Sequence, residues 1–114
     1  MHELSVAQNI VDIVKENIPE SDYGNVNNIK LEIGEYSGII ADSLQFCFDA
    51  IKFETPLQNA KIEIKNIPFV LFCNVCKINT SNTMGIRLCG NCGGFDTNII
   101  SGTDMRIIEV EIDS

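Results

Sequence analysis

The sequence has little histidine, little positive charge and no long apolar segment. His2 is the only histidine among 114 residues, so any imidazole chemistry is confined to the amino terminus. Eight Lys and Arg residues stand against sixteen Asp and Glu residues, and the net charge of −8 argues against nonspecific binding to nucleic acid. The longest apolar run, residues 67–73, is too short for a membrane span, and we recognise no signal peptide. We therefore expect a cytoplasmic protein.

The amino terminus carries several nitrogen donors within three residues. A bulky His2 disfavours removal of Met1, so we expect the free Met1 amine to survive. This amine, the His2 amide nitrogen and the His2 imidazole can close two chelate rings on one metal, and the Glu3 amide offers a fourth nitrogen. A planar, nitrogen-rich set of this kind is typical of Ni(II) or Cu(II). The residues alone leave open the alternative that His2 is a solvated terminal residue.

Four cysteines form two C-x2-C pairs, Cys73 with Cys76 and Cys89 with Cys92, separated by twelve residues. Two such pairs brought together make a tetrahedral four-sulfur cage, which is the arrangement of structural zinc sites. Four thiolates leave no open position for water or substrate, so we interpret the site as structural. Iron of the rubredoxin kind fits the same spacing, whereas disulfides are disfavoured without a secretory signal. Cys47 lies outside the pattern in an apolar helical stretch and is predicted to be part of the core.

Hydrophobic periodicity predicts two helices and three strands around the cysteine segment. Ser5 followed by Gln8 has the pattern of a capping box, and apolar residues then recur at helical spacing until Pro19. Asp42 with Gln45 has the same pattern ahead of a second helix. Alternating apolar residues predict strands at residues 29–33, 60–67 and 108–112.

These elements predict an α+β fold. A helix between the first two strands makes a crossover long enough for a parallel pair, and the C-terminal strand completes a small mixed three-stranded sheet with both helices on one face. The cysteine segment then forms an inserted zinc-ribbon-like module between the last two strands. We expect residues 1–68 and 100–114 to form one α/β domain, with residues 69–99 as the inserted four-cysteine zinc-binding module.

The sequence resembles the HypA/HybF hydrogenase maturation factors, a family of cytosolic nickel metallochaperones. The resemblance runs the whole length of the chain. It includes the Met1-His2-Glu3 start, the strand and turn at residues 31–37, the helix at residues 43–49, the paired cysteines, and the closing segment 105–112.

The resemblance implies a nickel site at Met1, His2 and Glu3, and structural zinc at the four paired cysteines. It also implies transfer of nickel to the large subunit of a [NiFe] hydrogenase, together with a maturation GTPase of the HypB type. The chain has no G-x-x-x-x-G-K-[ST] phosphate loop and cannot supply the GTPase activity itself. We expect a metal carrier and no enzymatic activity.

Asp42 is a further candidate in the nickel site, because some family members complete the nickel shell with an acidic residue near the start of the second helix. An Asp before a helix is otherwise an N-cap, and Glu3 is favourable for the helix dipole alone. Lys77 and Gly93 follow the cysteine pairs where some members have histidine, which argues against a histidine-driven acid switch at the zinc site. The alternative functions are a four-cysteine zinc-ribbon interaction module and a rubredoxin-like iron electron carrier.

Overall fold

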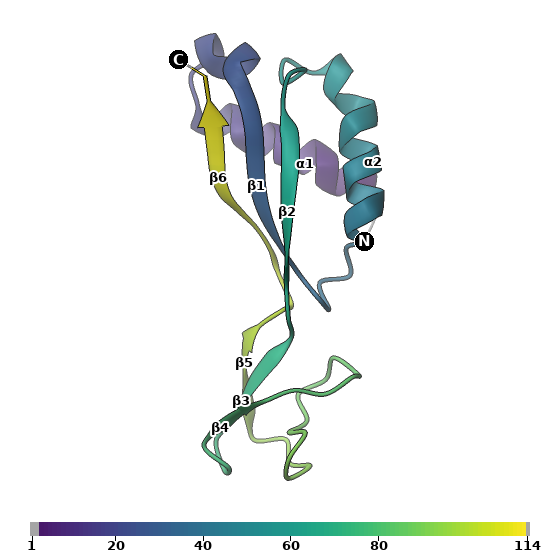
Figure 1. Cartoon of the computed structure of the whole chain (residues 1–114), viewed down its shortest axis with the longest axis vertical. Coiled ribbons are helices and arrows are strands. Elements are labelled where there is room, and N and C mark those ends of the chain that lie inside the picture. Colours follow the sequence, from purple (N-terminus) through teal and green to yellow (C-terminus); the bar gives the residue numbers. More distant parts are fainter. Residues whose placement is uncertain (1–2, 114) are drawn as a thin grey trace.

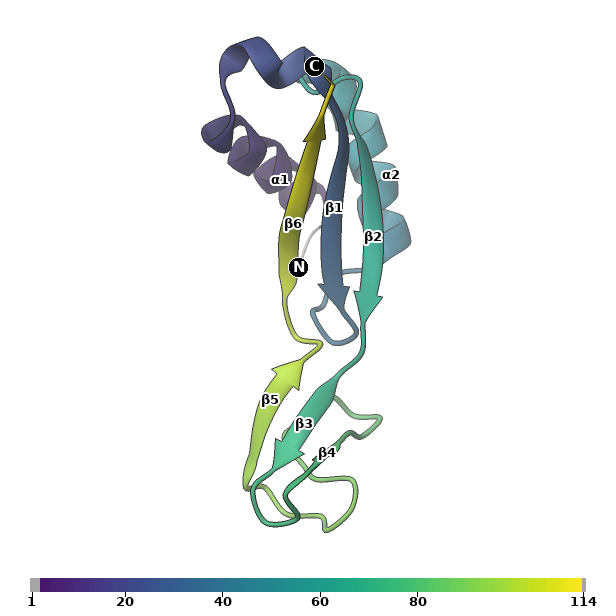
Figure 2. The ribbon, with the colours of Figure 1, turned by 60° about the vertical axis from the view of Figure 1, so that its left-hand side comes forward.

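The computed structural model describes residues 3–113, and the chain is elongated, with principal extents of 53 × 25 × 17 Å. Two three-stranded sheets follow one another along the long axis (Figure 1). The first sheet has the strand order β2-β1-β6 and the second has the order β4-β3-β5. Both α-helices lie with the first sheet, so the two ends of the molecule differ in construction (Figure 2).

The first sheet is built around β1 (Val26–Gly34). β2 (Lys61–Ile67) pairs with β1 in parallel, and β6 (Met105–Ile112) pairs with its other edge antiparallel. α2 (Ala41–Ile51) lies between β1 and β2 in the chain and supplies the crossover, while α1 (Glu3–Asn17) precedes β1. Both helices cover the same face of the sheet (Figures 1 and 2). The predicted mixed three-stranded sheet with two helices on one face is confirmed.

The core fills the space between this face and the two helices. α1 and α2 each contribute one apolar stripe at helical spacing, and β1 contributes every second residue because side chains alternate across a strand. Leu4, in the first turn of α1, is apolar but largely exposed and does not join this core. The fully buried members with the largest side chains are Phe48 and Leu44 of α2, Ile10, Val11 and Val14 of α1, Val26, Ile29 and Leu31 of β1, and Leu57 in the loop before β2.

Both predicted capping boxes are wrong. α1 already includes Glu3, so Ser5 lies inside the helix, and Gln8 donates to Asp12 one turn later, at 3.2 Å. α2 begins at Ala41 after an extended Ile40, with no side-chain cap hydrogen bond. The sequence pattern Ser/Asp-x-x-Gln also matches residues inside a first turn, and there Gln side chains bond four residues onward instead of back to a cap.

The second sheet occupies the chain between β2 and β6. It consists of β3 (Val70–Cys73), β4 (Ile78–Thr80) and β5 (Thr97–Ser101), and both pairings with β3 are antiparallel. β3 follows β2 after two residues that include Pro68, and β5 returns to β6 through Gly102. The segment therefore leaves and re-enters the first sheet at neighbouring points, as expected of an insertion.

The turn after β1 joins the two sheets. The Glu35 N–H donates to the carbonyl of Ile67 and the Tyr36 N–H to that of Gly102, each at 2.8 Å. The Glu35 carboxylate accepts a bond from the Phe69 N–H at 3.2 Å, and the Tyr36 ring packs edge-on against the Phe69 ring with centroids 5.3 Å apart. Gly102 has φ 95° and lies directly against the Phe69 backbone, so a side chain there would be both strained and obstructed.

Two short 3₁₀ segments complete the secondary structure, η1 (Glu20–Asn25) before β1 and η2 (Lys52–Glu54) at the end of α2. The Tyr23 hydroxyl of η1 donates to the Lys15 carbonyl at 2.8 Å and so ties η1 to α1. Within residues 3–113, no helix has the length and apolar character needed to cross a membrane.

Candidate metal centres

The four paired cysteines meet at the far end of the second sheet. Their sulfur atoms all lie within 4.8 Å of one another. Cys73 ends β3 and Cys76 follows in the turn before β4, while Cys89 and Cys92 belong to the turns ahead of β5. Among residues 3–113, this is the one group of three or more ligating side chains that converges closely enough to hold a metal ion.

The two cysteine turns share the same backbone design. In the first, the Cys76 N–H points to Cys73 Sγ at 3.4 Å, and in the second the Cys92 N–H points to Cys89 Sγ at 3.3 Å. The residue after each pair donates its N–H to the carbonyl of the first cysteine, Lys77 at 2.8 Å and Gly93 at 3.0 Å. Each turn thus offers two sulfur atoms on one side and aims the N–H of the second cysteine at the sulfur of the first.

Lys77 and Gly93 both have positive φ, 61° and 74°. The left-handed conformation suits glycine and is strained for a residue with a side chain. The C-G-N-C-G sequence around Cys92 gave a signal for this turn, but nothing at Lys77 did, because lysine has no preference for it. The symmetry of the two turns becomes visible only in the structure.

Proton sharing among the crowded thiols splits the acidities of the second pair. The Cys92 N–H, followed by the Asn91 N–H, outweighs burial and lowers the pKa of Cys89 to about 6. At Cys92 the Gly94 N–H favours the thiolate, but hydrogen bonds with Cys76, Cys89 and Cys73 together with burial raise its pKa to about 12. Four thiolates cannot coexist at this spacing without a compensating charge, and a divalent cation supplies that charge.

The donor set fits a structural metal ion. Four sulfur donors in a closed cluster are the ligands of structural zinc and of mononuclear iron, and all four are free thiols in the structure. Cys73 and Cys89 are buried, while the Asn91 side chain donates to Cys76 Sγ at 3.4 Å and can orient it from outside. The cluster can therefore bind a metal such as zinc, with all four positions taken by protein.

The predicted nickel residues are described only in part. Met1 and His2 lie outside the described residues. Glu3 is half-buried at the start of α1, and its carboxylate accepts a bond from the Ile40 N–H at 3.4 Å. The interpretation of Asp42 as an N-cap is wrong, because Ile40 occupies that position and Asp42 is exposed in the first turn of α2. The starts of the two helices therefore lie together.

Cys47 is half-buried on α2 and packs against the core of the first sheet, as predicted. Sequence reasoning missed Glu35 and Tyr36, which fix the junction between the sheets, and Asn91, which contacts the cysteine cluster. Glu35 and Tyr36 lie inside the turn that the family resemblance already included, but their contacts depend on residues far along the chain.

Comparison with known proteins identifies the family. The model described as "Hydrogenase/urease nickel incorporation, metallochaperone, hypA" matches residues 1–112. Hydrogenase maturation factor HypA of Nostoc sp. is 40% identical over 113 residues, covering 99% of this chain and 96% of that protein. Hydrogenase maturation factor HypA 2 of Bradyrhizobium diazoefficiens is 34% identical over 113 residues, covering 99% of this chain and all of that protein.

A solved structure agrees with the fold. The solution structure of the Ni metallochaperone HypA from Helicobacter pylori has a TM-score of 0.70 at 22% identity, and the match covers 98% of this chain and 97% of that one. The two relatives each cover 99% of this chain, and the family model covers residues 1–112, which include both cysteine pairs. The chain therefore belongs to the HypA family of nickel metallochaperones of hydrogenase maturation, which carry a metal and are not enzymes.

Proposed function

We propose that this metallochaperone holds its Ni(II) cargo at the amino terminus. The ligands are the Met1 amine, the backbone amide nitrogens of His2 and Glu3, and the His2 imidazole. The match of the nickel-incorporation family to a segment that starts at Met1, in a chain with His2 as its only histidine, carries this proposal. Deprotonated amides and neutral imidazole suit Ni(II) in a planar set.

Glu3 contributes to this site through its amide, since its carboxylate already bonds the backbone at the start of α2. Asp42 is a further candidate ligand, supported by its exposed position in the first turn of that helix. A protonated imidazole cannot ligate a metal, so nickel affinity is expected to fall as the pH drops through the usual histidine range.

We assign zinc to Cys73, Cys76, Cys89 and Cys92, where it acts as a structural ion. The closed four-sulfur cluster supports this assignment. We retain the division into an α/β domain of residues 1–68 and 100–114 and an inserted module of residues 69–99. Because these thiols must stay reduced to bind the ion, we place the protein in the cytoplasm.

The receivers that we propose are the large subunit of a [NiFe] hydrogenase and a maturation GTPase of the HypB type. Relatives named as hydrogenase maturation factors support the hydrogenase as the destination. Nickel passes by ligand exchange inside a docked complex, so the carrier neither makes nor breaks a covalent bond in a substrate.

The test compares His2→Ala with Asp42→Ala and with the unchanged protein, all with a native, tag-free amino terminus. Calorimetric titration with Ni(II) should show stoichiometric binding that His2→Ala abolishes, while bound zinc and the circular dichroism spectrum stay the same. Loss of binding in His2→Ala with only weaker binding in Asp42→Ala would rank the two ligands. An unchanged titration in His2→Ala would refute the terminal site.

Metal analysis of the same samples tests the structural ion. A colourless protein with one zinc per chain fits the assignment. A red protein with thiolate-to-iron absorption would instead favour the rubredoxin-like electron carrier.

A further inference from the structure

The outward side of α2 and of η2, which continues it, carries an apolar ridge that the core does not use. Phe46 is 75% exposed and Phe53 is 66% exposed, although Phe48 on the opposite face of the same helix is fully buried. Ala50 is exposed between the two phenylalanines and lies one helical turn after Phe46, while Phe53 lies in η2, the 3₁₀ turn that continues α2. A helix that covers a sheet normally has a polar outer face. α2 is therefore apolar on two sides, and the core accounts for one of them.

The charges beside this ridge are acidic. Asp42, Asp49 and Glu54 are all exposed along the same segment. Lys52 is the only basic residue between Ala41 and Glu54, and its side chain is only 15% exposed.

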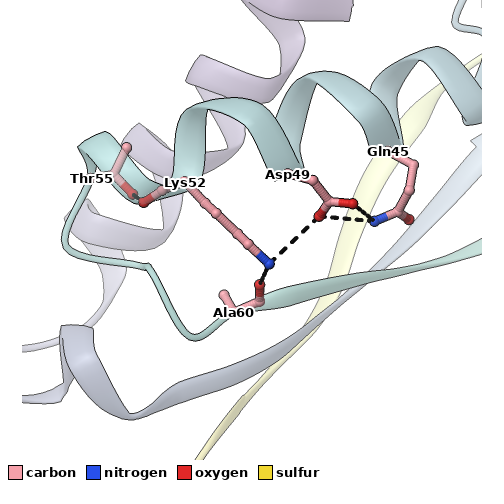
Figure 3. A network of polar contacts seen from close by, with 5 residues as sticks. All are labelled: Gln45, Asp49, Lys52, Thr55 and Ala60. Carbon is pink, nitrogen blue, oxygen red and sulfur yellow. Dashed lines mark hydrogen bonds and ion pairs between the residues drawn. The ribbon is translucent and has the colours of Figure 1, made fainter.

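Figure 3 shows where Lys52 points: its Nζ donates to the Ala60 carbonyl at 3.2 Å and lies 3.6 Å from Asp49 Oδ1. Lys52 therefore ties the end of α2 to the start of β2, and its Nζ also lies 5.5 Å from the centroid of the Phe53 ring. The one basic side chain of this segment is thus engaged within the chain. Asp49 keeps half of its side chain exposed despite this contact.

We propose that the ridge of Phe46, Ala50 and Phe53 is the docking surface for the protein that receives nickel, and that this partner presents an apolar groove bordered by Lys and Arg. Burial of two exposed aromatic side chains supplies the affinity, as in other complexes where a helix face enters a groove. The acidic border supplies orientation and selects a basic partner. The proposal deepens the metallochaperone function and rests on it.

Charge and position favour this occupant over others. A second copy meeting the same ridge would bring acidic borders together in a chain of net charge −8, and anionic membranes or nucleic acids would be repelled for the same reason. The ridge also begins next to the cargo, since the Ile40 N–H at the entry to α2 bonds the Glu3 carboxylate. A partner seated along α2 therefore lies beside Glu3, whose amide is one of the proposed ligands.

The chain offers a matched control for the ridge. Phe95 is 73% exposed, but it lies near the cysteine cluster, at the other end of the molecule from α2. Phe46→Ser and Phe95→Ser therefore remove the same exposed side chain from two different surfaces. Neither residue is part of a core, so both variants should fold.

The experiment places the photo-crosslinking residue p-benzoylphenylalanine at position 46, 53 or 95 of the full chain in cells that assemble the metalloenzyme, and identifies the crosslinked peptides by mass spectrometry. Positions 46 and 53 should crosslink to the same partner protein, through a peptide that combines apolar residues with Lys or Arg, and position 95 should not.

The purified partner should then bind Phe46→Ser roughly tenfold more weakly than the unchanged chain, and Phe95→Ser with unchanged affinity. Asp49→Lys should weaken binding at low salt and matter less at high salt.

Crosslinks at positions 46 and 53 only to further copies of this chain would overturn the proposal, as would equal crosslinking at position 95 or an acidic contact peptide. Nickel titration of Phe46→Ser separates this failure from failure of the carrier function. The variant should still bind Ni(II) like the unchanged protein, since the ridge holds no ligand. Loss of nickel binding in the unchanged protein would instead refute the terminal nickel site and leave the crosslinking result standing.

Discussion

The two ends of the molecule are each stabilised by a different means. The helix-backed sheet buries a continuous cluster of apolar side chains from two helices and three strands. The second sheet buries few side chains, namely Phe69, Leu71, Thr97, Cys73 and Cys89, and two of these are the cysteines themselves. A segment of about thirty residues is too small to build a sufficient core, and the metal ion proposed for the four-cysteine cluster takes the place of that core. One chain can therefore combine two means of stabilisation, apolar burial in the part that is large enough for a core and metal ligation in the part that is too small for one.

Charge follows the same division. Residues 69–99 contain only Lys77, Arg87 and Asp96 as charged side chains, whereas fifteen of the sixteen acids lie elsewhere. The acidic part is the part that begins with the proposed nickel ligands and carries the ridge of Phe46, Ala50 and Phe53. The metal module is nearly uncharged before its ion is bound.

The largest expected effect is the unfolding of the four-cysteine module while the helix-backed sheet stays folded. Cys89→Ser removes a buried ligand, and the free energy of a structural Zn(II) site, about 10–16 kcal/mol in small zinc modules, is also folding free energy. Hydrogen exchange should show loss of amide protection in β3 and β5 with β1 still protected. Cys47→Ser is the matched control, because it changes a thiol outside the cluster and should leave both sheets protected. Full protection of β3 in Cys89→Ser would show that the module folds without its metal.

The next largest expected effect is on the stability of the helix-backed sheet. Phe48→Ala empties a fully buried position in the helix-backed core and should lower the free energy of unfolding of that sheet by about 3–5 kcal/mol. Urea denaturation followed by circular dichroism measures the loss. Phe46→Ala, on the exposed face of the same helix, should change it by less than about 0.5 kcal/mol. Comparable losses in the two variants would mean that Phe46 is packed in solution.

A smaller effect is expected when the two cysteine turns of the module are compared with each other. Lys77→Gly relieves a left-handed backbone at the first cysteine turn and should stabilise the module by about 1 kcal/mol. Gly93→Ala, at the equivalent position of the second turn, should destabilise it by a similar amount, since its added carbon meets open space and only the backbone is strained. Competition with a chelator should show metal retention shifted in opposite directions, each about fivefold. Shifts of the same sign would contradict the equivalence of the turns.

The smallest effect concerns the exposed face of the first sheet. Lys30 Nζ lies 3.1 Å from Glu109 and 3.2 Å from Glu111. Bonds to Glu109 and then Glu111 raise the pKa of Lys30, while bonds from Asn28 and then Lys30 lower the pKa of Glu111. The stabilisation is present between the ordinary values of 4.5 and 10.5. It is lost as acid protonates Glu111 or as alkali deprotonates Lys30.

Lys30→Gln should therefore lower the urea midpoint slightly near neutral pH. The difference from the unchanged protein should shrink at high salt, because all these groups are solvent-exposed. A difference that persists at high salt would point to a packing role for the lysine stem instead of an ionic one.

Sequence reasoning reached the helix-backed sheet because its signals are local and repeated. Alternation at Ile29, Leu31 and Ile33 and helical spacing through Val11 and Val14 each depend on neighbouring residues. The crossover length and handedness rules then restrict the topology to the mixed sheet that the structure shows. The cysteine spacing likewise predicted a cluster, because two short turns must each present both sulfur atoms together.

The features that sequence reasoning missed depend on how residues are arranged in the folded structure. The capping boxes failed because the same residue pattern fits inside a helical turn, where Gln8 and Gln45 bond forward along the helix. The junction formed by Glu35 and Tyr36 joins residues more than thirty positions apart, so it produces no periodic pattern in the sequence. The exposed ridge on α2 was hidden for a related reason, since a phenylalanine in a helix predicts burial until its neighbours are placed.

The most direct test of the account is a Ni(II) titration of the tag-free chain, with intact Met1 verified by mass spectrometry, beside a version that carries one additional residue before Met1. The account predicts stoichiometric nickel binding by the native chain and its loss in the extended version, because the extension turns the terminal amine into an amide. Bound zinc and the amide protection of both sheets should be identical in the two proteins. Equal nickel binding by both would contradict the terminal site and move the cargo elsewhere in the molecule.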